Sequence, residues 1–140
     1  MMSTEKEKDL ERAKDQAKAQ LESIQEMVKI LQSEDGGEYD GETISQDDVR
    51  ERIQEDPLEV SVRGNWHTPG EKAEDSEYLI LLCTGGPAVR IIGDLGKYNE
   101  PETARLEYQD WFTPWVEYPL TGEEEKDVLT YAREFYYGEA

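Results

Sequence analysis

Residues 5–33 carry a helical repeat that constrains the fold more than any other feature of the chain. Six apolar side chains fall on one stripe, at spacings of three, four or seven residues: Leu10, Ala17, Leu21, Ile24, Val28 and Leu31. No Gly or Pro occurs in this segment. At 1.5 Å per residue it predicts a helix about 43 Å long, which is longer than a domain of this size is wide. Either the helix lies across the rest of the domain and overhangs it, or its stripe is the seam of a homodimeric coiled coil.

Residues 34–140 are expected to form a compact acidic α+β domain beside this N-terminal helix of residues 1–33. Residues 34–43 contain Gly36, Gly37 and Gly41 without periodicity, which indicates a loop. Ser45 followed by Asp48 has the spacing of a capping box and predicts a short helix over about 46–55. Pro57 stops that helix.

Four segments beyond residue 57 have the character of strands. Residues 58–63 alternate between apolar and polar, whereas residues 78–84 are apolar throughout and predict a central strand covered on both faces. Residues 88–95 and 103–111 complete the set, and residues 115–118 extend the last edge beyond Pro114. Thr121 then caps a C-terminal helix. The fold class expected is α+β, with one four-stranded antiparallel sheet whose helices cover one face.

The charge of the chain narrows its function. It has 34 acidic and 15 basic residues and a net charge of −19, so direct binding to nucleic acid or to an anionic membrane is not expected. The charge is uneven, because residues 34–56 contain ten acidic and two basic residues while residues 1–33 contain seven and six. One cysteine, no long apolar run and no apolar segment near the start favour a soluble, cytoplasmic protein without a disulfide or a signal peptide.

The candidates for catalysis are weak. Cys83 and His67 are the only thiol and the only imidazole, but Cys83 lies in the apolar run 78–84, where burial raises a thiol pKa and makes the group a poor nucleophile. Gly85-Gly86 is followed by a strand rather than a helix, which indicates a turn and not a phosphate loop. The acidic pairs and triplets stand at helix starts, where capping explains them. We therefore expect no catalytic residue, cofactor or metal.

Five aromatic side chains occur close together near the end of the last strand: Tyr108, Trp111, Phe112, Trp115 and Tyr118. One interpretation is that they cover the open end of the sheet beneath the helices. The other is that they anchor an interface and that the neighbouring acids select a basic partner.

Two segments carry a resemblance to known proteins: GGPAVRIIGDL at residues 85–95 and ARLEYQDWFTPW at residues 104–115. Together with the acidity, they resemble small hypothetical proteins encoded by bacteriophages and mobile elements. The resemblance implies an accessory role in infection, such as the inhibition of host defences directed at nucleic acid (anti-CRISPR or anti-restriction). It implies no particular site residues.

The function predicted is therefore a non-catalytic inhibitor, a DNA mimic that binds a basic nucleic-acid-binding protein or defence nuclease complex in the host cytoplasm. Alternate residues of a strand lie about 6.6–6.8 Å apart on one face, so a row of carboxylates there can imitate phosphates. The expected partner-binding residues are Asp47, Asp48, Glu51, Asp94, Glu107, Asp110, Trp111, Trp115 and Glu117. The alternative is a homodimeric scaffold or regulatory adaptor, assembled through the seam of the N-terminal helix, whose acidity serves solubility only.

Overall fold

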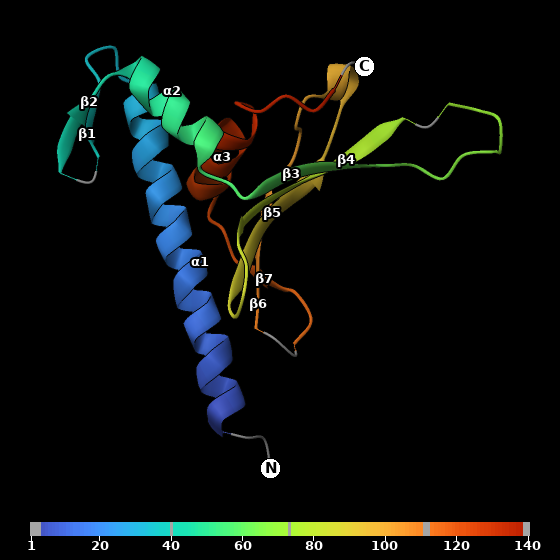
Figure 1. The fold of residues 1–140 in the computed structure, drawn as a ribbon, viewed down its shortest axis with the longest axis horizontal. Coiled ribbons are helices and arrows are strands. Elements are labelled where there is room, and N and C mark those ends of the chain that lie inside the picture. Colours follow the sequence, from blue (N-terminus) through green and yellow to red (C-terminus); the bar gives the residue numbers. More distant parts are fainter. Residues whose placement is uncertain (1–3, 40, 73, 111–112, 139–140) are drawn as a thin grey trace.

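The computed structural model describes residues 4–39, 41–72, 74–110 and 113–138 and has an α+β fold (Figure 1). The fold class predicted from the sequence is confirmed, and so are the three helices. The elements in chain order are α1 (Thr4–Leu31), β1 (Gly37–Tyr39), β2 (Glu42–Ile44), α2 (Gln46–Glu55), β3 (Glu59–Gly64), β4 (Asp75–Cys83), β5 (Ala88–Asp94), a single 3-10 turn at Lys97–Asn99, β6 (Arg105–Gln109), β7 (Val116–Tyr118) and α3 (Gly122–Ala132).

The main sheet has five strands rather than the predicted four. Its order is β3-β4-β5-β6-β7, and each strand pairs antiparallel with the next. The fifth strand, β7, follows Pro114 and pairs Val116 with Tyr108 and Tyr118 with Leu106. The chain therefore turns back between β6 and β7 and forms a separate strand instead of extending β6.

The segment expected to be a loop, residues 34–43, contains the small hairpin β1–β2. Each of its strands has three residues, which is too few for a period-two pattern to be recognised in the sequence. Gly36 and Gly41 have φ values of 74° and 81°, so these glycines supply the left-handed backbone that its turns require. The hairpin contacts the end of α1.

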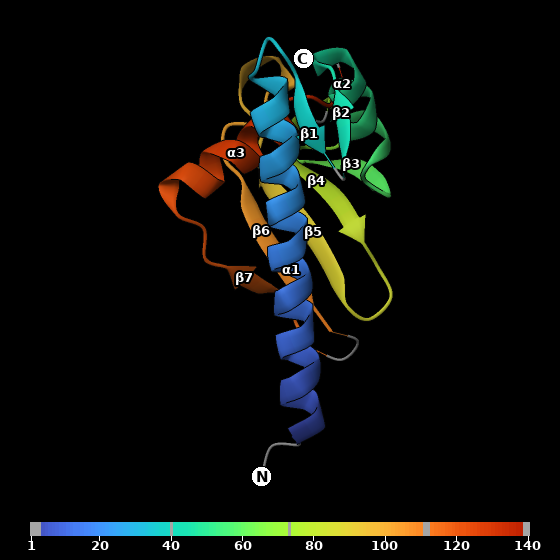
Figure 2. The same ribbon diagram turned by 90° about the vertical axis from the view of Figure 1, so that its left-hand side faces the viewer.

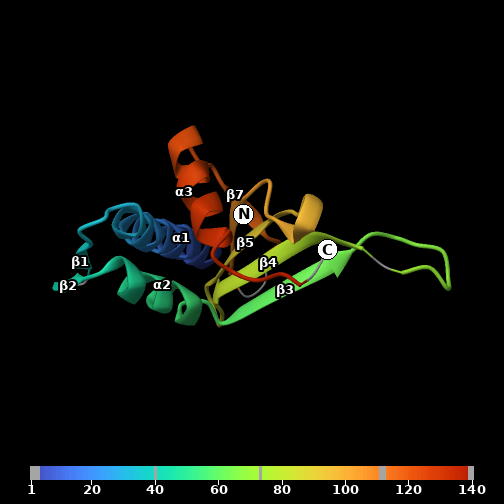
Figure 3. The ribbon, with the colours of Figure 1, turned by 90° about the horizontal axis from the view of Figure 1, so that it is seen from above.

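All three helices lie on one side of the five-stranded sheet (Figures 1 and 3). Burial alternates along β4: Tyr78, Ile80 and Leu82 face the helices and are buried, whereas Leu79 and Leu81 are only half-buried. The prediction that this strand is covered on both faces is therefore wrong. Among the described residues, no helix or strand packs against the second face, which we call the open sheet face.

The apolar stripe of α1 lies inside this single chain. Five of the six predicted seam residues are buried: Ala17, Leu21, Ile24, Val28 and Leu31. The sixth, Leu10, packs at the margin of the same core. Helix α1 contacts α2, α3 and strands β5 and β6, and it lies across the sheet in Figure 2. The predicted dimer seam is thus an intramolecular packing surface, because the sheet and α3 supply the apolar partner that a second helix would supply in a coiled coil.

Substitution of the stripe tests this assignment. We expect Ile24→Ala, at a fully buried position, to lower the free energy of unfolding by about 2–5 kcal/mol because it leaves a cavity in the core. Glu22→Ala, on the exposed face of the same helix, is the control and changes it by about 0.5 kcal/mol or less. Chemical denaturation at several protein concentrations measures both. If Ile24→Ala lowers the free energy of unfolding mainly through a concentration-dependent loss of dimer, and hardly at all in the monomer, an intramolecular role for Ile24 is contradicted.

Three tyrosine hydroxyls are buried and satisfied within the core. Tyr78 donates to the Thr103 carbonyl at 2.6 Å, Tyr137 to the Ala132 carbonyl at 2.6 Å, and Tyr131 to the Asp56 carboxylate at 2.7 Å. Burial raises the pKa of all three phenols well above the ordinary value, and the Asp56 carboxylate raises that of Tyr131 further.

These tyrosines make the fold sensitive to alkali. Their folded-state pKa values exceed the unfolded value of about 10, so their contribution to stability is complete below that pH and is lost as pH rises above it. We expect ionisation of the three phenols to coincide with unfolding when tyrosinate absorbance and circular dichroism are followed together. Complete ionisation of all eight tyrosines with the native circular dichroism retained would contradict their burial.

Candidate binding surface

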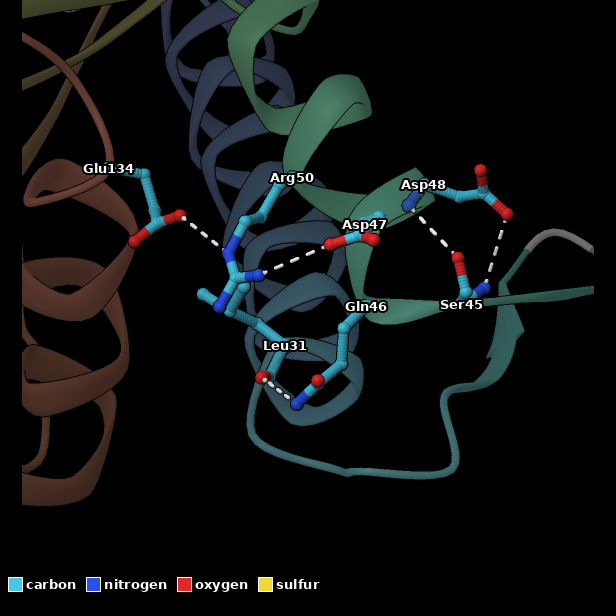
Figure 4. A network of polar contacts seen from close by, with 7 residues as sticks. All are labelled: Leu31, Ser45, Gln46, Asp47, Asp48, Arg50 and Glu134. Atoms are coloured by element: carbon cyan, nitrogen blue, oxygen red, sulfur yellow. Dashed lines mark hydrogen bonds and ion pairs between the residues drawn. The ribbon is translucent and has the colours of Figure 1, made fainter.

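Helix α2 is fixed at its first turn by the predicted capping box (Figure 4). The Ser45 hydroxyl accepts from the backbone N–H of Asp48 at 3.1 Å, and the Asp48 carboxylate accepts from the N–H of Ser45 at 3.3 Å. Gln46 donates to the Leu31 carbonyl at 2.9 Å. The cap satisfies amides that the helix leaves free, and the Gln46 bond ties the start of α2 to the end of α1.

The outward face of α2 carries a row of three carboxylates. Asp47, Glu51 and Glu55 are four residues apart and all exposed, so they follow one another at steps of about 6 Å along the helix. On the opposite face, Val49 and Ile53 are fully buried in the core. Because the apolar face fixes the rotation of the helix, the row of carboxylates is directed to solvent.

These carboxylates belong to a larger surface formed by α2 and the β1–β2 hairpin, which lie together at one end of the molecule (Figure 1). We call it the acidic end. Its exposed acidic residues are Glu34, Asp35, Glu38, Glu42, Asp47, Asp48, Glu51 and Glu55.

Both arginines of this segment are already paired. Arg50 lies 3.4 Å from Asp47 and 3.7 Å from Glu134 of the chain after α3. Arg52 lies 3.1 Å from Glu42 and also stacks on the ring of Tyr39. Within the described part of the chain, the other five carboxylates of the acidic end outside the cap have no basic side chain within ion-pair distance: Glu34, Asp35, Glu38, Glu51 and Glu55.

Most of the other predicted partner-binding residues lie on the open sheet face. There the Glu107 carboxylate accepts a hydrogen bond from Arg90 Nε at 2.8 Å and forms an ion pair with Nη2 at 2.8 Å, and the side chains of Glu107 and Arg90 are 16% and 20% exposed. The Arg90 guanidinium also lies 4.1 Å from the ring centre of Trp115. The predicted residues Glu107 and Trp115 are therefore close together, but an arginine that the prediction left out neutralises the carboxylate.

The remaining predicted residues are placed as follows. Asp94 at the end of β5 accepts from the Thr103 hydroxyl at 3.3 Å, and Glu117 of β7 is exposed directly opposite Glu107. Asp110 follows β6 in a turn closed by Thr113. Trp111 lies outside the described residues, as does Phe112. The structure thus divides the prediction into two groups on opposite sides of the sheet.

The expectation of a carboxylate row along a strand is not met on the open sheet face. The strand register places Arg90 beside Glu107, and Arg63 binds Glu77 at 2.7 Å on the same face. Leu79, Leu81 and Ile92 lie between these pairs and are half-buried. The face is therefore a mixture of ion pairs and apolar side chains. The apolar run 78–84 was the sequence signal for this apolar character, because in that run the residues that point to either face of the strand are apolar.

The aromatic cluster is divided as well. Tyr108 is buried beneath the helices, and Tyr118 packs on it edge-to-face with ring centres 6.5 Å apart. Trp115 lies on the other side of the sheet, under Arg90. The described part of the cluster thus packs against the protein itself.

Cys83 and His67 do not form a dyad. His67 lies in the exposed connection before β4, whereas Cys83 is the last residue of that nine-residue strand, so the whole strand lies between them. Burial raises the pKa of the Cys83 thiol. In the described ranges, no three His, Cys, Asp or Glu side chains are arranged to hold a metal ion, and no described helix is long and apolar enough to cross a membrane.

Comparison of the chain with protein-family models, with curated proteins and with solved structures finds no match. The candidate site therefore rests on its geometry and charge.

The pair on the open sheet face has a measurable structural role. We expect Arg90→Ala to lower the free energy of unfolding by about 1–3 kcal/mol, because it leaves the half-buried Glu107 carboxylate without its donors and uncovers Trp115. Arg63→Ala, measured in dilute protein, is the matched control. Arg63 pairs with Glu77 across the strands, but its side chain is 72% exposed, so the pair contributes about 1 kcal/mol or less to the free energy of unfolding. Equal losses in urea denaturation would contradict the role given to Arg90.

Proposed function

We propose that this chain is a non-catalytic inhibitor whose acidic end occupies the basic nucleic-acid-binding surface of a host defence complex. The observation that carries the proposal is the solvent-facing row of Asp47, Glu51 and Glu55 on α2, within a surface whose only two arginines are already paired. A surface of this kind attracts clustered Lys and Arg side chains, which are the groups that proteins use to contact phosphates.

The row on α2 has nearly the spacing that the sequence analysis expected of a carboxylate row on a strand. Successive carboxylates on α2 are about 6 Å apart along the helix, close to the 6.6–6.8 Å expected for alternate residues of a strand. The proposed mimic thus acts through a helix rather than through the face of a strand. The capping box and the buried Val49 and Ile53 hold this helix rigidly, so little ordering entropy is lost when a partner binds.

The distribution of charge over the chain favours one binding surface over general acidity. Residues 34–56 carry a net charge of −8, whereas the long helix segment 1–33 is nearly neutral. A uniform solubility device does not need this asymmetry. The field of such a patch accelerates association with a basic partner, and salt screens it with a Debye length of about 8 Å at physiological ionic strength.

The resemblance of residues 85–95 and 104–115 to phage-encoded proteins supports the biological setting of the proposal. The described part of these segments includes β5 and β6, which contribute to the core and to the open sheet face. They contribute no carboxylate to the acidic end. Their part in the proposal is therefore to support the surface and not to contact the partner.

The alternative function, a homodimeric scaffold, loses the interface on which it was based. The stripe of α1 that was expected to form the seam is buried against the sheet and α3 of the same chain. A dimer of this protein has to form through another surface.

A charge-neutralised variant tests the acidic end. The triple variant Asp47→Asn, Glu51→Gln, Glu55→Gln removes the row without changing its shape. Three exposed charge pairs contribute about 0.2–1 kcal/mol each, so we expect binding of the captured partner to weaken by about three- to 150-fold. Capture from a bacterial lysate at low salt identifies the partner, and titration with the purified partner gives the affinity.

The control is a variant with the same change in charge at the same spacing on α1: Glu7→Gln, Glu11→Gln, Asp15→Asn. These three residues are also exposed and four apart, but they lie on the nearly neutral helix. We expect the control to bind as the unmodified protein does. An equal loss for both variants would mean that net charge alone governs binding, and no loss for the α2 variant would place the site elsewhere.

A further inference from the structure

Strand β3 forms a free edge of the five-stranded sheet. It is the terminal strand in the order β3-β4-β5-β6-β7, and no other helix or strand of the described residues lies beside its outer edge (Figure 3). Among the described residues, five large apolar side chains are classed as exposed, and three of them lie on this strand or beside it: Leu58 at 60%, Val62 at 41% and Trp66 at 103%. A free, partly apolar edge strand is a template for pairing with another strand.

The backbone groups on this edge belong to Val60 and Val62. The Ser76 carbonyl accepts a hydrogen bond from the backbone N–H of Leu95, so the backbone groups of Ser76 point toward β5. In an antiparallel sheet successive residues point their backbone groups to opposite sides, so those of Glu77 point toward β3. Its partner on β3 is Arg63. The residues on β3 with the opposite parity, Val60 and Val62, therefore direct their N–H and C=O groups outward.

The sequence of β3 is complementary to itself when it runs antiparallel. The sequence is Glu59-Val60-Ser61-Val62-Arg63. When a second copy runs antiparallel with its Ser61 opposite Ser61, each acid faces a base and each valine faces a valine. We propose that β3 pairs with β3 of a second copy of this chain about a twofold axis through Ser61, joining two sheets into one. The pairing places Glu59 opposite Arg63 of the second copy twice, and valine opposite valine twice.

Backbone and side chains agree on this register. Val60 opposite Val62 of the second copy is a hydrogen-bonded pair in which all outward N–H and C=O groups are used. Shifting one strand by two residues against the other keeps the backbone hydrogen-bond pattern. It places Ser61 opposite Glu59 or Arg63, however, so Glu59 and Arg63 no longer face each other. Opposite charges and β-branched residues facing each other across strands stabilise a sheet, so the symmetric register is favoured.

The charges at this edge are available for the pairing. Glu59 is exposed and has no ion-pair partner in the described part of the chain. Arg63 binds Glu77 through Nε and Nη2, is 72% exposed, and keeps Nη1 for a second carboxylate. Glu77 is thus no obstacle to the new pair.

The edge also lies in a neutral part of a strongly acidic chain. Residues 57–70 contain one acid and one base, although the whole chain has a net charge of −19. At physiological ionic strength charges beyond about 8 Å are largely screened, so the strand itself adds no net repulsion when two copies meet at it. The inference does not depend on the proposed function, because β3 contributes no residue to the acidic end.

Two single-charge variants and their mixture test the register. Glu59→Arg alone places Arg opposite Arg63 of the second copy, and Arg63→Glu alone places Glu opposite Glu59 of the second copy. We expect each variant to dimerise at least tenfold more weakly than the unmodified chain in sedimentation velocity. In an equimolar mixture all four charges are again complementary, so we expect a heterodimer that native mass spectrometry distinguishes from both homodimers.

Two controls separate loss of pairing from loss of fold. Glu117→Arg makes the same change in charge on the opposite edge strand, β7, and leaves the dimer intact. We expect Val62→Lys to abolish the dimer, because it puts a charge on the pairing edge. We expect the dilute variant to unfold as cooperatively on heating as the unmodified monomer, which shows that its fold is intact. A chain that stays monomeric up to about 1 mM overturns the proposal. So does a dimer that the Glu59, Arg63 and Val62 variants leave unchanged, or a mixture that yields no heterodimer.

Discussion

The packing of the α1 stripe against one face of the sheet is the interaction on which the rest of the structure depends. Ala17, Leu21, Ile24 and Val28 join a core to which the sheet, α2 and α3 contribute. Helices α1 and α3 both lie on this face, and no described helix lies on the opposite face. The hydrogen bond from the Gln46 side chain to the Leu31 carbonyl holds the start of α2 at the end of α1. The place and direction of the acidic end therefore follow from where α1 lies on the sheet.

The fold distributes the charge of the chain into distinct regions. On the open sheet face Arg90 pairs with Glu107 and Arg63 with Glu77, and the edge strand β3 carries one acid and one base. The acidic end keeps carboxylates that no described basic side chain pairs. These regions suit different contacts. Ion pairs stabilise the sheet, a neutral edge permits strand pairing, and a surface with an excess of carboxylates selects a basic partner.

Much of the fold was predictable, and the failures have physical causes. The 3.6-residue period gave α1, and Ser45 with Asp48 gave the start of α2, because these signals are local. Whether the α1 stripe meets a second chain or its own sheet depends on tertiary packing, which periodicity does not encode. The same holds for the apolar run 78–84, which is compatible with burial on both faces or with an open face. Of the site, Asp47 and Glu51 were named from charge density alone. The neutralisation of Glu107 required the register that brings Arg90 beside it.

The central claim is that the acidic end takes the place of nucleic acid on a basic partner. The most direct measurement is the affinity for the captured partner over a series of salt concentrations, with and without competing double-stranded DNA. We expect the logarithm of the association constant to fall linearly as the logarithm of the salt concentration rises, and we expect DNA to displace the chain from its partner. An affinity that is unchanged from low to high salt, or a complex that binds DNA and this protein together without competition, would contradict it.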